Sequence, residues 1–98
     1  MAELKDKVAC RTPAKGRDGV TNIPAWKFEA VRDAILSICE EETVFADLFK
    51  RVSEHLTEDQ LSKLGSINWH VTTVKLELEV RGEIARVPDA KPQKLIRT

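Results

Sequence analysis

The first clear pattern in the chain is a run of apolar residues at helical spacing. Apolar side chains recur every three or four positions over residues 28–39, which is typical of a helix with one buried face. Asn22 is a good N-cap residue, and Pro24 lies where a missing backbone N–H costs nothing. We therefore expect a helix over residues 24–40, stopped by the carboxylates of residues 40–42, which oppose the helix dipole. The apolar positions of this helix are Phe28, Val31, Ala34, Ile35, Ile38 and Cys39.

A second apolar stripe follows a short segment that favours β-structure. Residues 43–45 are Thr-Val-Phe, which predicts a brief strand, and the stripe beyond them predicts a helix over residues 46–55. Thr57 and Gln60 have the spacing of a capping box, so a third, short helix should begin there and end near Gly65. The stripe consists of Phe45, Leu48, Phe49, Val52 and Leu56.

Residues 66–82 satisfy two patterns at once. Apolar and charged residues alternate over residues 74–81, as they do in a half-buried strand. Apolar residues also repeat at helical spacing over residues 67–78, and Gly82 is placed as a helix stop. Periodicity alone therefore leaves both structures open.

The last part of the chain has the pattern of a β-hairpin. Residues 84–87 read as one strand and residues 93–97 as another. The connection over residues 88–92 contains two prolines and an Asp, which are turn residues. It also carries a Lys, so the hairpin should have a basic tip.

The residues on either side of Gly82 resemble the junction between recognition helix and wing in winged helix-turn-helix domains. In those folds the Gly ends the recognition helix in a left-handed conformation, and the Ile after it begins the first wing strand. This resemblance favours a helix over residues 66–81. The residues that carry it are Val74, Leu78, Glu79, Gly82, Ile84 and Arg86.

A longer likeness points in the same direction. Residues 69–79, 82–86 and 91–95 are similar to a small bacterial family of uncharacterised winged-helix-like proteins. The likeness covers roughly residues 22–98. It implies a fold and conveys no activity, and fold by itself does not define function.

The expected fold class is therefore α+β, a small winged helix-turn-helix domain over residues 22–98. It should have three to four helices and a C-terminal β-hairpin wing. Residues 1–21 lack helical periodicity and should form a flexible basic arm, with a short extended piece at residues 7–11. We expect the core to contain Phe28, Val31, Ile35, Phe45, Leu48, Val52, Val71, Val74, Leu78 and Ile84.

The charges of the chain balance overall but are unevenly distributed. The 98 residues include 16 Lys plus Arg and 16 Asp plus Glu, for a net charge of zero with neutral His. Residues 1–22 sum to +2, residues 23–80 to −5 and residues 81–98 to +3, as counted from the sequence. An acidic body with two basic ends is a pattern that a partner could recognise.

Binding to duplex DNA is the function that the expected fold and the basic ends favour. In a winged helix the recognition helix can enter the major groove while the wing contacts the backbone. Uncharged polar side chains can read base edges, and cations can neutralise phosphates. The expected contacts are Asn68, His70, Thr72, Thr73 and Lys75 on the helix face opposite the core, Arg86, Lys91, Lys94 and Arg97 on the wing, and Lys7 and Arg11 on the arm.

A protein-interaction module is the alternative, with a protein partner or a second copy of the chain. Zero net charge is unfavourable for binding phosphates, and Glu77 and Glu79 follow Lys75 on the same predicted helix. Trp26 and Trp69 are candidate anchors because Trp is enriched at interface hot spots. Packing in the core is the other explanation for each Trp.

Nothing in the sequence indicates an enzyme. Ser53, Glu54 and His55 are adjacent, but neighbouring residues of a helix point in different directions. The chain contains neither a Gly-x-Ser-x-Gly motif nor a phosphate-binding glycine loop. We therefore expect no catalysis, no cofactor and no small-molecule substrate.

Metal binding and membrane insertion are not expected either. The Cys and His residues lack the spacing of zinc ligands, and no apolar run is long enough for a membrane span or a signal peptide. We therefore expect a cytoplasmic protein with both cysteines as thiols. The residues concerned are Cys10, Cys39, His55 and His70.

Overall fold

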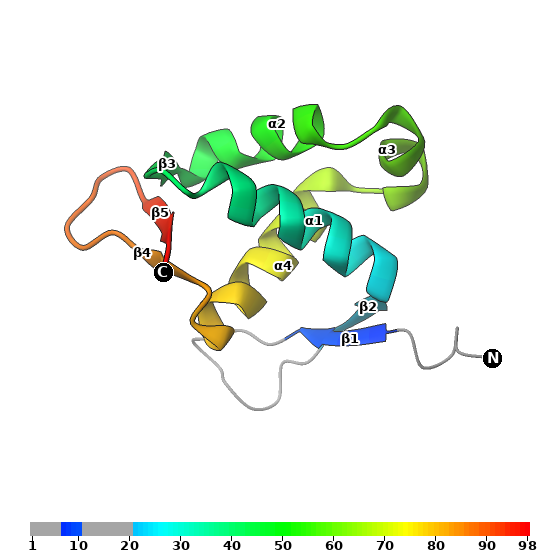
Figure 1. Cartoon of the computed structure of the whole chain (residues 1–98), viewed down its shortest axis with the longest axis horizontal. Helices are drawn as coiled ribbons and strands as arrows, with labels where there is room; N and C mark the ends of the chain where they lie inside the picture. Colours follow the sequence, from blue (N-terminus) through cyan, green and yellow to red (C-terminus); the bar gives the residue numbers. More distant parts are fainter. Residues whose placement is uncertain (1–6, 11–20) are drawn as a thin grey trace.

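The structure is a computed structural model that describes residues 7–10 and 21–98. In this part of the chain, four helices and two small antiparallel sheets make a mixed α+β fold (Figure 1). None of the helices described is long and apolar enough to cross a membrane. The elements are β1 (Lys7–Cys10), β2 (Thr21–Pro24), α1 (Ala25–Ile38), β3 (Thr43–Val44), α2 (Phe45–His55), α3 (Glu58–Leu64), α4 (Ile67–Arg81), β4 (Ile84–Arg86) and β5 (Lys94–Arg97).

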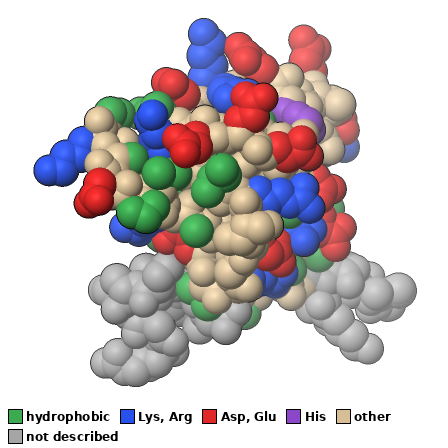
Figure 2. All heavy atoms as spheres, turned by 60° about the vertical axis from the view of Figure 1, so that its left-hand side comes forward, with side chains coloured by type: hydrophobic (Ala, Val, Ile, Leu, Met, Phe, Trp, Pro, Cys, Tyr) green, Lys and Arg blue, Asp and Glu red, His purple; other side chains and the backbone are tan. Residues whose placement is uncertain are grey.

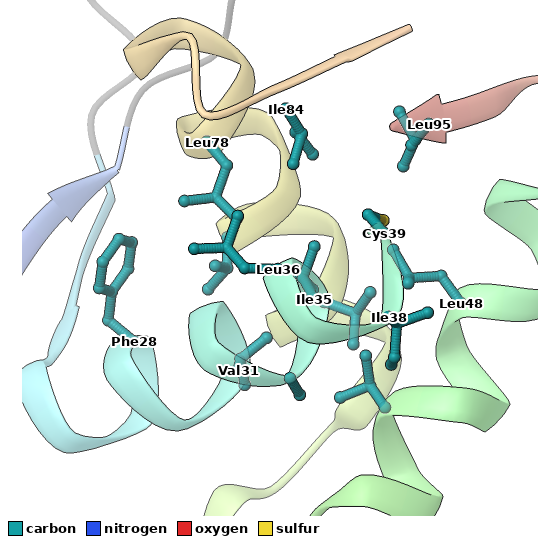
Figure 3. Close-up of a cluster of buried hydrophobic side chains, with 14 of the residues drawn as sticks. Phe28, Val31, Ile35, Leu36, Ile38, Cys39, Leu48, Leu78, Ile84 and Leu95 are labelled. Carbon is teal, nitrogen blue, oxygen red and sulfur yellow. The ribbon is translucent and has the colours of Figure 1, made fainter. Parts of the chain in front are cut away.

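The hydrophobic core lies where α1 packs against α4 and α2. Val31 of α1, Leu48 of α2 and Leu78 of α4 are all fully buried. Ile84 of β4 and Leu95 of β5 join the same cluster, so the C-terminal sheet closes one end of the core (Figure 3). Each of these side chains contributes about 2 kcal/mol through removal of apolar surface from water.

The predicted core is confirmed at nine of its ten positions. Only Phe45 differs, because its ring is half-buried at the start of α2, against the ring of Phe49 at 5.2 Å between centroids. The structure adds core residues that the sequence does not reveal, among them Cys10, Ile23 and Leu95. These three lie on strands too short for a periodic pattern to show which face is buried.

The first helix is close to its predicted position, but its cap is not. The sequence predicts residues 24–40, and α1 spans Ala25–Ile38, with Pro24 as N-cap and no side-chain cap hydrogen bond. The expectation that Asn22 caps this helix is wrong. Asn22 instead pairs with Ala9 in the β1–β2 ladder and remains exposed, because the extended backbone continues as far as Pro24.

The capping box and the brief strand are confirmed. The Thr57 hydroxyl accepts a hydrogen bond from the Gln60 backbone N–H at 3.1 Å, and the Gln60 side chain accepts one from the Thr57 N–H at 2.9 Å. These two bonds satisfy donors that the first turn of α3 leaves free. Before α2, β3 covers Thr43–Val44, within the segment predicted as β.

The ambiguous segment is a helix. Ser66 caps α4, and Gly82 ends it with φ 78° and ψ 19°, the left-handed conformation expected for this glycine. Apolar and charged residues alternate here as in a strand because Lys75 and Glu77 occupy buried positions of α4 beside its apolar face. Since α4 contacts α1, α2, α3, β1 and β4, its polar residues are enclosed on several sides and the helical stripe is hard to recognise.

The C-terminal hairpin forms a sheet with the strand that precedes α2. The strand order is β3-β5-β4, and both pairings are antiparallel. Thr43 pairs with Leu95, and Ile84 pairs with Arg97, so the last strand lies between the other two. The hairpin is therefore held to the helical core on both sides.

The N-terminal strand corresponds to the extended piece predicted at residues 7–11. In the described part of residues 1–21, Lys7–Cys10 forms β1 and pairs with β2, with Val8 opposite Ile23. Cys10 and Ile23 are both buried, and β1 contacts α1 and α4. The predicted extended piece is therefore present as β1, and it packs against the helices, which the sequence does not reveal.

Leu78→Asp should unfold the protein, because it places an unpaired charge at the centre of the core. We expect a loss of at least about 4 kcal/mol, comparable to the whole stability of a domain of this size. Circular dichroism with urea titration measures the loss. Ala46→Asp, at an exposed position in the first turn of α2 where the helix dipole favours an acid, is the control and should change stability little. A folded Leu78→Asp variant of nearly normal stability would contradict the core assignment.

Candidate interaction surface

The exposed start of α4 is organised by the residue that caps it. The Ser66 hydroxyl accepts a hydrogen bond from the backbone N–H of Trp69 at 3.1 Å, which satisfies one of the free donors of the first turn. Asn68 and Trp69 are both exposed there, and Trp69 is 45% accessible. The first turn contains no acidic residue. This end of the helix therefore presents uncharged side chains together with the positive end of the helix dipole.

His70 is buried, so the expectation that it faces solvent is wrong. It is 8% exposed, and its Nδ1 donates a hydrogen bond to the backbone oxygen of Ser66 at 2.7 Å. Its ring meets the indole of Trp69 edge-on, with 4.8 Å between ring centroids. The helical turn places this imidazole over the carbonyl four residues earlier. His70 therefore supports Trp69 and is not available to a base or a phosphate.

The remaining predicted residues on this part of α4 do lie together on its outer side. Asn68 is exposed, while Thr72 and Thr73 are half-buried. Their spacing, with that of Trp69, brings them to one side of the helix. We name these four residues, Asn68, Trp69, Thr72 and Thr73, the α4 surface. None of its side chains carries a charge.

Lys75 is enclosed, contrary to the expectation of a phosphate contact. Its side chain is 3% exposed, and its Nζ lies 2.7 Å from a carboxylate oxygen of Glu79. The same ammonium lies over the ring of Phe45, 4.6 Å from its centroid. The carboxylate one turn later and the ring at the start of α2 together replace water around the charge. Lys75 therefore holds α4 to α2.

Arg86 is bound by the same carboxylate. Its Nε and Nη2 atoms lie 3.3 Å from the two oxygens of Glu79, a two-point contact between β4 and α4. The side chain of Glu79 is 9% exposed, whereas that of Arg86 is 54% exposed. We name Lys75, Glu79 and Arg86 the Glu79 cluster. It joins α2, α4 and the hairpin through one anion.

The other predicted cations are distributed around the molecule. Arg97 forms a loose pair with Glu40 at 3.7 Å, and both side chains are largely exposed. Lys91 is exposed and Lys94 is half-buried on the hairpin, and within the described chain neither has a carboxylate within 4 Å. Lys7 is exposed on β1. Arg11 lies outside the described residues.

The face that carries the hairpin shows no continuous basic area. Figure 2 shows acidic and basic side chains interspersed on it, with apolar side chains between them. A second set of ion pairs is found where α4 meets α1, with Arg81 bound to Glu77 at 2.8 Å and Arg32 bound to Glu83 at 2.8 Å. Arg32, Arg81 and Arg86 are thus held by acids of the same chain, whereas Lys91 and Lys94 on the hairpin are not held by any acid of the described residues.

Trp26 is the second exposed Trp. It is 42% accessible in the first turn of α1, and the Lys27 ammonium lies 5.8 Å from its ring centroid. Lys27 also donates a hydrogen bond to the Leu64 carbonyl at 3.2 Å, which ties α1 to the end of α3. Core packing is therefore not the role of either Trp.

Cys39 is a buried thiol at the end of α1. Burial raises its pKa above the ordinary value, while a hydrogen bond with Thr43 and the charge of Arg51 act in the opposite direction. The thiol stays protonated at neutral pH, so it is a poor nucleophile. Cys10 is also buried, and neither cysteine forms a disulfide.

A hollow of about 540 Å³ runs along the outer side of α2. Acidic and basic side chains of this one helix line it, which suits solvent better than a specific small ligand. In residues 7–10 and 21–98, no group of three or more His, Cys, Asp or Glu side chains could hold a metal ion. The lining residues are Ala46, Asp47, Lys50, Arg51 and Glu54.

Most of the chain matches a known protein family. Residues 7–95 match a family described as "Family of unknown function (DUF6958)". The chain belongs to this family. The match begins at β1 and ends within β5, so it includes both sheets and all the helices described. No curated protein and no solved structure matches the chain.

Glu79 is the residue whose role the sequence conceals. From the sequence it is an unfavourable charge beside a DNA-binding face, whereas in the structure it binds cations from two elements. The i,i+4 spacing of Lys75 and Glu79 predicts their pairing on a helix. Its contact with Arg86 depends on how the hairpin folds back, which no local pattern encodes.

Glu79→Gln should destabilise the protein more than Lys75→Met. The first change leaves a buried ammonium without its carboxylate, which costs about 3–5 kcal/mol. The second removes the buried charge and leaves Glu79 bound to Arg86, so its cost should be less than half as large. Urea unfolding followed by circular dichroism measures both changes.

The exposed Asp59–Lys63 pair on α3, 3.4 Å apart, provides the control. Asp59→Asn should change stability by less than about 1 kcal/mol. A Lys75→Met variant that loses as much stability as Glu79→Gln would contradict the proposed burial of the cluster.

Proposed function

We propose that the chain is a winged-helix module that binds a protein partner through the α4 surface. The order of its elements supports a winged helix: a helix, a short strand, further helices, a long helix and a hairpin. The strand order β3-β5-β4 supports it too, because the last strand enters between the first and second strands of that sheet. In this scheme α4 is the recognition helix and residues 84–97 form the wing.

The observation that carries the protein-binding proposal is the exposed indole of Trp69 on a surface without charge. A Trp side chain can bury about 150–250 Å², so covering the part of Trp69 that is exposed would contribute about 2 kcal/mol to binding. His70 and the Ser66 cap hold the first turn of α4 in place. A preorganised aromatic anchor loses little entropy when it binds.

The chemistry of the α4 surface defines the partner. Asn68, Thr72 and Thr73 offer hydrogen-bond donors and acceptors without charge, so they fit a rim of uncharged polar groups. Trp69 fits an apolar pocket. The partner is therefore a folded protein with an apolar pocket in an uncharged polar rim, distinct from a strongly charged peptide.

Duplex DNA is the second candidate partner, and one observation favours it. Asn68, Thr72 and Thr73 lie at the start of the recognition helix of the proposed winged helix, where side chains read base edges. Lys91 and Lys94 on the hairpin are the cations placed to contact phosphates. The burial of Lys75 and the pairing of Arg86 with Glu79 disfavour DNA, because affinity for phosphates depends on free cations.

The module is further proposed to act in the bacterial cytoplasm. The sequence resemblance implies a bacterial source. Cys10 and Cys39 are both buried and form no disulfide, which suits a reducing compartment where thiols persist.

Trp69→Ala should strongly weaken binding of the protein partner. A benzophenone side chain placed at Asn68 and activated by light in cells should crosslink one protein to the otherwise unchanged chain, and mass spectrometry identifies it. The isolated partner should then bind the unlabelled wild-type chain in calorimetry. Trp69→Ala should weaken that binding at least about tenfold, as expected for a hot-spot Trp.

Trp26→Ala is the matched control, since this Trp is equally exposed but lies on α1. It should bind the partner as the wild type does. Equal binding by wild type and Trp69→Ala, or crosslinking only to nucleic acid, would contradict the proposal. A crosslink to a second copy would show that the surface is an interface for self-association.

A further inference from the structure

The contact between Arg86 and Glu79 has the form that a phosphate contact would take. Two nitrogens of one guanidinium face two oxygens of one anion, each at 3.3 Å. Arginines bind phosphate in this two-point manner. In the proposed winged helix, Arg86 lies where the recognition helix meets the wing, the region that contacts the DNA backbone.

We propose that Glu79 prevents this winged-helix module from binding nucleic acid, by placing a carboxylate where a backbone phosphate would otherwise contact Arg86. Glu79 is thus a specificity-determining residue, which selects protein over nucleic acid as the partner. The inference rests on the winged-helix part of the proposed function.

Two physical effects of Glu79 disfavour a phosphate at Arg86. Glu79 occupies donors of Arg86 that a phosphate needs, and its own negative charge repels a phosphate brought to the same place. Specificity in proteins often depends on such a repulsive element against the wrong partner. Like charges brought together at an interface are strongly unfavourable. One carboxylate therefore removes an attraction and adds a repulsion.

The cluster is built so that this carboxylate stays in place. Lys75, 2.7 Å away and 3% exposed, holds Glu79 from the interior side. A phosphate that displaced Glu79 from Arg86 would not release it from Lys75. The pair between Arg97 and Glu40 differs, because both side chains are largely exposed and 3.7 Å apart. Such a surface pair is worth little, so a phosphate could readily displace Glu40.

The Glu79 cluster also explains why Lys75 itself cannot contact nucleic acid. Its ammonium lies between Glu79 and the ring of Phe45, 4.6 Å from the ring centroid. Removing Glu79 alone would leave this buried charge without its carboxylate, so a variant of Glu79 needs a partner substitution that protects the fold.

The test measures binding of a fluorescein-labelled, random-sequence DNA duplex by anisotropy at low salt. The wild type should show no binding at protein concentrations of about 100 µM, the weak end of nonspecific binding. The variant Lys75→Met/Glu79→Gln removes the buried pair together and keeps the wild-type net charge. Its affinity should be at least about tenfold higher, with a salt slope increased by about one, as expected for one added phosphate contact.

Two controls distinguish the effect of releasing Arg86 from the effect of removing an ion pair anywhere in the protein. Adding Arg86→Gln to the double variant should abolish the gain. Asp59→Asn/Lys63→Met, which removes an exposed ion pair on α3, far from the hairpin in Figure 1, and also keeps the net charge, should leave the affinity unchanged. Circular dichroism of each variant verifies that it is folded.

Each outcome decides the inference. A folded double variant that gains no affinity, or one whose gain survives Arg86→Gln, would overturn it. So would DNA binding by the wild type through α4 and the hairpin, which would instead support the second candidate function. Failure to find a protein partner would overturn the proposed function alone, because this test does not involve that partner.

Discussion

The carboxylate of Glu79 lies between two cations that come from different parts of the fold, and it helps the β3–β5 pairing and the buried Ile84 to place the hairpin. Lys75 connects it to the ring of Phe45 at the start of α2, and Arg86 connects it to β4. A nearly buried anion is unfavourable unless it is well paired. The chain meets this condition by providing one partner from the same helix and another from the strand that follows. The interaction therefore joins α4, α2 and the hairpin in one arrangement.

This arrangement has a consequence for function because the same cations are the ones that a DNA-binding winged helix would present. With Lys75 buried and Arg86 bound, the outer side of α4 keeps an uncharged surface around an exposed Trp69. In the function that we propose, the fold supplies a rigid frame and the internal ion pairs select a protein partner over nucleic acid. Membership of a family of unknown function adds no activity to this account. The assignment therefore depends on the chemistry of the surface.

Local signals in the sequence predict much of the fold. The Thr57–Gln60 capping box, the left-handed Gly82 and the hairpin strands each depend on a few neighbouring residues, and each is found where the pattern places it. The burial of Lys75 and His70 could not be predicted, because it depends on Phe45, Glu79 and the Ser66 carbonyl surrounding them in three dimensions. The pairing of β1 with β2 depends on contacts with α1 and α4. From the sequence alone, residues 1–21 are interpreted as a basic arm with a short extended piece.

The most direct measurement is the side-chain ¹H–¹⁵N spectrum of the arginines in the wild-type protein. A hydrogen bond to a carboxylate slows exchange of an N–H with water, even on a side chain that is 54% exposed. We expect the Arg86 Nε–H signal to exchange much more slowly than that of Arg51, an exposed arginine on α2, and the protection to be lost in Lys75→Met/Glu79→Gln. An Arg86 signal that exchanges as fast as that of Arg51 would show that Glu79 does not hold the hairpin, which would contradict the account.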